Sequence, residues 1–81
     1  MSWTNVSTLD SPFNAGGKKF RVDIEGEQRS DGTWGGRVVF VDGKTSLRTA
    51  QETSQPDRKA LEYWATGLEA VYLEGALARA R

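Results

Sequence analysis

The clearest pattern in the chain is a strict alternation of apolar and polar residues between Lys18 and Glu25. Phe20, Val22 and Ile24 fall on one side, and charged residues fall on the other, which is typical of a strand with one buried face. Turn-forming residues follow in the segment 26–32, including the pair Asp31-Gly32. The pattern therefore predicts a half-buried strand that leads into a hairpin.

A second alternating segment begins at Trp34, with Trp34, Val38 and Phe40 on one face and Arg37, Val39 and Val41 on the other. Its glycine pair, Gly35-Gly36, predicts a bulge or a close backbone approach. Asp42-Gly43 is a two-residue hairpin signal, and a weaker strand follows over about 44–50. These segments predict an antiparallel meander of three strands.

The remaining sequence predicts one long helix that runs to Ala80. Ser54 with Asp57 three residues later resembles a capping box, and Pro56 suits a first helical turn. Such a helix would have about 25 residues and a length of roughly 38 Å. Gly67 lies inside it, where glycine costs about 1 kcal/mol relative to alanine, so we expect a bend or close packing there.

The predicted helix carries two apolar stripes. The broader one, which we expect to cover the sheet, consists of Leu61, Trp64, Ala65, Leu68, Val71, Tyr72 and Gly75. The second consists of Tyr63, Ala70, Leu73 and Leu77, spaced seven, three and four residues apart. One sheet cannot cover both sides of a helix, so the second stripe predicts a contact with a second copy or with a protein partner. The alternative is scattered surface apolarity, which is normal for a soluble domain.

The fold class that follows is α+β, with a three-stranded antiparallel meander packed on one long C-terminal helix. Residues 1–17 form an N-terminal arm, and residues 18–81 form a single β-β-β-α domain. The arm is polar but contains Trp3 and Phe13, so it is either a partly ordered terminus or an additional strand that covers an open edge.

Composition excludes several classes of function. The 81 residues include no cysteine and no histidine, which removes disulfides, thiolate chemistry and the commonest general base and metal ligand. We therefore expect no enzyme, no cofactor and no metal site. Eleven basic and eleven acidic residues give a formal net charge of zero, so no overall field attracts a polyanion. The chain shows neither a membrane-spanning segment nor a signal peptide, and we expect a cytoplasmic protein.

Three local patterns carry candidate chemistry. Gly43-Lys44-Thr45-Ser46 resembles the end of a phosphate-binding loop, but Val38 occupies the position of the required first glycine, so a hairpin turn is expected. Asp23, Glu25 and Glu27 share a strand face with Arg21 and are expected to be solvated rather than metal-binding.

The third pattern concerns single-stranded nucleic acid, which is bound by aromatic rings together with basic side chains. Arg37, Lys44 and Arg48 on the second and third strands are the candidate contacts. Trp34 is the nearest aromatic residue, but it falls on the face assigned to the core.

The segments Asp31-Gly32-Thr33-Trp34, Glu52-Thr53 and Ala60-Leu61, in this sheet-then-helix order, resemble the small HicB-like antitoxin domain over residues 18–80. The same order resembles the C-terminal part of double-stranded-RNA-binding domains. The chain lacks the Pro-Gly-Cys-type segment and the appended DNA-binding domain of the antitoxins, so the resemblance implies the β-β-β-α fold and assigns no functional residues.

The functional expectation is a non-catalytic interaction or regulatory module. It would act through a homodimer or protein-partner contact on the C-terminal helix, at Tyr63, Ala70, Leu73 and Leu77. The alternative is a single-stranded nucleic-acid-binding domain that uses the sheet face.

Overall fold

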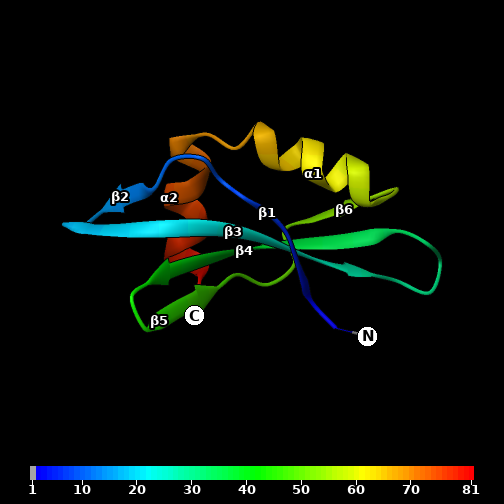
Figure 1. The fold of residues 1–81 in the computed structure, drawn as a ribbon, viewed down its shortest axis with the longest axis horizontal. Coiled ribbons are helices and arrows are strands. Elements are labelled where there is room, and N and C mark those ends of the chain that lie inside the picture. The colour runs from blue at the N-terminus through cyan, green and yellow to red at the C-terminus, as the bar shows by residue number, and fades with distance from the viewer. Residues whose placement is uncertain (1) are drawn as a thin grey trace.

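The computed structural model describes residues 2–81 and shows six strands followed by two helices in that range (Figure 1). The strands are β1 (Thr4–Thr8), β2 (Phe13–Ala15), β3 (Lys18–Gln28), β4 (Trp34–Asp42), β5 (Thr45–Arg48) and β6 (Thr53–Gln55). The helices are α1 (Arg58–Thr66) and α2 (Ala70–Arg79). The prediction of three strands on one long helix is therefore wrong in both the number of strands and the form of the helix.

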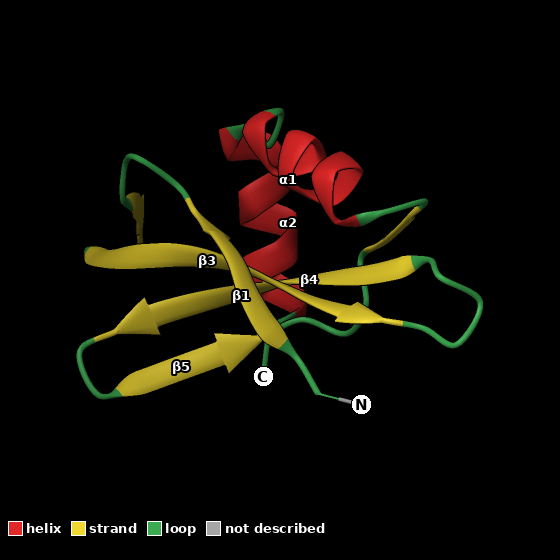
Figure 2. Cartoon of the chain, turned by 45° about the vertical axis from the view of Figure 1, so that its right-hand side comes forward, coloured by secondary structure: helices red, strands yellow, loops and turns green. Residues whose placement is uncertain are grey.

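The long hairpin of β3 and β4 is the centre of a sheet whose strand pairs are all antiparallel. Val22 lies opposite Phe40 and Ile24 opposite Val38, and all four side chains are buried. The alternation along both strands directs these side chains towards the helices, as the sequence pattern predicts. In Figure 2, α2 lies behind β3 and β4, and α1 lies along the upper rim.

The additional strands are short and pair with the two central ones. β1 and β2 pair with β3, whereas β5 and β6 pair with β4. β1 contains one strongly apolar residue, Val6, and β6 contains none. Their sequences carry little strand signal of their own, and the long neighbouring strands supply the hydrogen bonds that hold them extended.

The N-terminal segment is part of the sheet and of the core. Phe13 at the start of β2 is buried, and its ring lies 6.0 Å from that of Phe40, centroid to centroid. Val6 and Leu9 also pack against the core. The N-terminal residues thereby cover one side of the β3–β4 hairpin.

The predicted long helix is interrupted between Thr66 and Ala70. The N–H of Gly67 closes the last turn of α1 on the carbonyls of Trp64 and Ala65, and Glu69 is extended with φ −106° and ψ 167°. The interruption rotates the face that α2 presents to the sheet. Leu73 and Ala76 are consequently buried, whereas Val71, which was expected in the core, is 80% exposed.

The beginning of α1 also differs from the sequence prediction. The carboxylate of Asp57 accepts a hydrogen bond from the backbone N–H of Ala60 at 2.8 Å, so Asp57 is the N-cap residue. Ser54, the predicted cap, lies in β6 opposite Gly35. The helix therefore starts one turn later than the capping-box pattern suggests.

Two glycines allow α1 to pack closely on the sheet. Gly26 and Gly36 are opposite each other on β3 and β4. A Cβ atom at Gly36 would lie 2.5 Å from Leu61 Cδ1, and one at Gly26 would lie 2.6 Å from Leu61 Cδ2. The fully buried Leu61 side chain thus occupies the space that Cβ atoms at positions 26 and 36 would fill if these residues were not glycine. The pairing of β3 with β4 runs through Gly35-Gly36 without a bulge, and the group that approaches Gly36 closely is a helix side chain instead of the predicted backbone.

Candidate interaction surface at the corner between the helices

The structure does not bring the four predicted contact residues onto one surface. Tyr63 is 80% exposed and Ala70 is exposed, but Leu73 is only 6% exposed and belongs to the core. Leu77 is partly buried and packs against the same core. The predicted stripe assumes an unbroken helix, and the interruption at residues 67–69 separates its members.

A different apolar surface forms where the two helices meet. Tyr63 on α1 and Val71 on α2, the two large hydrophobic residues with the greatest exposure in the described chain, flank a hollow of about 560 Å³. Trp64, Leu68 and Tyr72 contribute to its walls. We call this hollow and its flanking residues the corner surface.

Two aromatic rings give the corner surface a defined shape. The ring of Trp64 meets that of Tyr72 edge to face, with centroids 6.1 Å apart and planes at 89°. Such an arrangement places the positive edge of one ring against the negative face of the other and is worth about 0.5–1.5 kcal/mol beyond burial. Both residues also pack against the core, so the walls of the hollow are anchored on their inner side.

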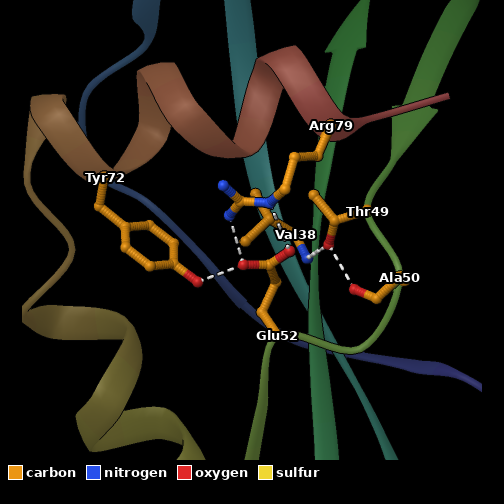
Figure 3. A network of polar contacts seen from close by, with 6 residues as sticks. All are labelled: Val38, Thr49, Ala50, Glu52, Tyr72 and Arg79. Atoms are coloured by element: carbon orange, nitrogen blue, oxygen red, sulfur yellow. Dashed lines mark hydrogen bonds and ion pairs between the residues drawn. The ribbon is translucent and has the colours of Figure 1, made fainter.

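Tyr72 is further fixed by a polar network that joins α2 to the segment before β6 (Figure 3). Its hydroxyl donates a hydrogen bond to the carboxylate of Glu52, which also pairs with the guanidinium of Arg79 at 2.6 Å. Burial alone would raise the pKa of Glu52, but the hydrogen bonds from Arg79 and Tyr72 outweigh it and lower the pKa. Burial and the adjacent Glu52 raise the pKa of Tyr72 to about 12.

Thr49 holds the other end of this segment against β4. Its buried hydroxyl accepts a hydrogen bond from the N–H of Val38 at 3.1 Å and donates one to the carbonyl of Ala50 at 2.7 Å (Figure 3). Because Thr49 and Glu52 tie one short segment to both β4 and α2, the position of Tyr72 is coupled to the centre of the sheet.

The face of the sheet opposite the helices is covered by ion pairs. Arg37, one of the predicted nucleic-acid contacts, pairs with Glu25 at 2.7 Å, and its guanidinium lies 4.2 Å from the ring centroid of Trp3. Arg48 is exposed on β5, and Lys44 is exposed in the turn after β4. Arg37 is therefore already engaged within the chain.

The acidic row on this face is less solvated than the sequence suggests. Asp23 is only 6% exposed and accepts hydrogen bonds from Arg21 and Thr8, and Glu27 pairs with Arg29. No group of three potential metal ligands occurs among residues 2–81. Nor does this part of the chain contain a helix long and apolar enough to cross a membrane.

The corner surface contains residues that the sequence analysis had assigned elsewhere or passed over. Trp64, Leu68, Val71 and Tyr72 were expected to face the sheet, and no role was assigned to Glu69. The segment Gly67-Leu68-Glu69 is the signal that could have revealed them, because a helix that ends at Gly67 gives α2 a new rotational phase.

Comparisons of the chain with protein-family models, curated proteins and solved structures found no match. The resemblance to the HicB-like domain stays a prediction.

Proposed function

We propose that this protein is a non-catalytic interaction module whose contact surface is the corner between α1 and α2. The observation that carries the proposal is the exposure of Tyr63 and Val71, each 80% exposed, on either side of an apolar hollow. Contiguous exposed apolar groups with aromatic residues are typical of protein–protein contacts. The partner is a second copy of this chain or another protein, and we expect the protein to act in the cytoplasm.

The rigidity of the corner surface supports a binding role. Tyr72 is held by Glu52 and by its edge-to-face contact with Trp64, so its ring loses little conformational freedom when a partner covers it. Aromatic residues that are already ordered make good anchors in interfaces. The exposed Tyr63 and Val71 then supply the area that becomes buried on binding.

Sedimentation equilibrium across micromolar concentrations tests the homodimer form of the proposal. The wild-type chain should show a concentration-dependent mass above that of one chain, and the double variant Tyr63→Ser, Val71→Ser should not. Both residues are exposed, so the variant should keep the wild-type circular dichroism spectrum. A matched control replaces Lys44 and Thr45, which are exposed at the turn between β4 and β5 and do not line the hollow, with serine.

If the wild-type chain is a monomer, the proposed partner must be another protein. Photo-crosslinking tests this second form of the proposal. A photoreactive phenylalanine analogue at position 63 should give a discrete crosslinked band in an extract of the source cell. The same group at position 31, in the exposed turn between β3 and β4, should not. A monomer that gives the same crosslinks from both positions would contradict the proposal.

A further inference from the structure

The aromatic rings of this protein differ in whether they already hold a cation. The chain has three tryptophans and two tyrosines. Arg37 lies over Trp3 at 4.2 Å, Arg58 over Trp34 at 5.9 Å and Arg79 over Tyr72 at 5.9 Å, each measured to the ring centroid. Among residues 2–81, no such contact occurs at Tyr63 or Trp64. These two rings lie at the hollow of the corner surface.

The electrostatic surroundings of the hollow favour a positive charge. Glu69 is the only charged residue that lines it within the described chain, and its side chain makes no capping hydrogen bond to α2. The C-terminal end of α1 and the N-terminal end of α2, whose N-cap is Glu69, both lie at the hollow. Their opposite dipole ends offset each other, so the carboxylate of Glu69 is the remaining charge there.

The shape of the hollow suits a compact organic cation. The perpendicular rings of Trp64 and Tyr72 form adjoining walls, and Tyr63 stands at the rim. A volume of about 560 Å³ is within the range of small-ligand pockets, which is about 300–1,000 Å³. Aromatic walls with a nearby carboxylate attract ammonium and guanidinium groups through the negative faces of the rings.

We propose that the hollow between Tyr63, Trp64 and Tyr72 binds an organic cation, with Glu69 as its counter-ion. The cation belongs either to a free small molecule with an alkylated ammonium group or to an arginine side chain of the partner. The inference rests on the proposed function in the second case, where the cation is the group by which the partner is recognised.

Nuclear magnetic resonance titration of the full chain separates these sources. The probes are choline, its uncharged isostere 3,3-dimethylbutan-1-ol, the peptide Gly-Gly-Arg-Gly-Gly and the same peptide with citrulline in place of arginine. A charged probe should move the indole N–H resonance of Trp64 and leave those of Trp3 and Trp34 in place. Its uncharged counterpart should bind several-fold more weakly. A response to choline alone indicates a small molecule, and a response to the arginine peptide indicates a partner side chain.

Matched variants test the two parts of the site. Glu69→Gln should weaken binding of the charged probe, whereas Glu74→Gln, at an exposed carboxylate outside the hollow, should not. Tyr63→Ser should weaken it by roughly two- to fivefold, and Tyr63→Phe, which keeps the ring, should leave it unchanged.

Any one of three results would overturn the inference: charged and uncharged probes bind equally, all three indoles respond equally, or the two glutamate variants have equal effects. The sedimentation and crosslinking results do not depend on these titrations. An association at the corner without cation binding would therefore contradict only the inference, and cation binding without any association would contradict only the proposed function.

Discussion

At the scale of single residues, Glu52 shows how one carboxylate can fix an aromatic wall of the corner surface. It accepts hydrogen bonds from Tyr72 and Arg79, and its side chain is only 10% exposed. A carboxylate in that position would be costly without both partners. The sequence offers no hint of the contact, because Glu52 lies 20 residues from Tyr72 and 27 from Arg79.

We predict that Tyr72→Phe lowers the free energy of unfolding at neutral pH by about 1–2 kcal/mol, because Glu52 loses a hydrogen bond to its charged form. The folded-state pKa of Glu52 lies below its ordinary value of 4.5, so its stabilisation is present above that pH and is lost as the pH falls through the folded-state value. The difference between variant and wild type should therefore shrink in acid. Urea unfolding at several pH values measures it.

Tyr63→Phe is the matched control for this prediction, since Tyr63 is 80% exposed. It should leave the stability unchanged within about 0.5 kcal/mol. A Tyr72→Phe variant whose loss of stability does not shrink once the pH is below the folded-state pKa of Glu52 would show that the hydroxyl does not act through the ionised Glu52.

At the scale of elements, the boundaries of α1 decide which residues are available at the corner. Asp57 caps its start and Gly67 closes its last turn, which leaves a helix of 9 residues. A helix this short is marginal by itself, so its stability depends on the cap and on the packing of Leu61 and Ala65.

We predict that Asp57→Ala lowers the free energy of unfolding by about 1 kcal/mol, because the N–H of Ala60 loses its acceptor. Ser54→Ala, the corresponding change at the cap suggested by the sequence pattern, should change it by less than about 0.5 kcal/mol, since Ser54 is exposed in β6. Thermal and urea unfolding of the two variants compare them directly. A larger effect at Ser54 would place the start of α1 at the earlier position.

At the scale of the whole molecule, the two faces differ in how their polar groups are satisfied. On the open face of the sheet, Glu25 and Glu27 pair with arginines from the same face. The ring of Trp3 from the N-terminal segment lies against Arg37. A nucleic-acid strand laid across this face would meet carboxylates and would have to displace existing ion pairs.

We therefore predict that the wild-type chain binds single-stranded oligonucleotides no more tightly than about 10⁻⁴–10⁻⁶ M at roughly 0.15 M salt, the range of nonspecific binding. Fluorescence anisotropy with a labelled oligonucleotide measures this. Glu25→Gln, which frees Arg37, should bind somewhat more tightly, whereas Glu74→Gln on the helix side should not. Submicromolar binding by the wild type that weakens steeply with salt would support the nucleic-acid alternative at Arg37, Lys44 and Arg48.

The sequence by itself determined the central hairpin and its buried face. Alternation over residues 18–25 and 34–41 is a local property, because successive side chains of a strand point to opposite faces regardless of what lies beyond. The turn at Asp42-Gly43 follows from an equally local requirement on backbone conformation.

The tertiary structure decided the short strands, the interruption of the helix and the corner surface. β1 and β6 become strands because β3 and β4 offer unpaired backbone groups along their length, a condition that no short window of sequence contains. Similarly, the periodicity of residues 58–79 cannot show that the helix breaks at Gly67. The break permits Leu73 to reach the core and leaves Val71 beside Tyr63 at the surface, because burial on the sheet selects the rotation of each helix separately.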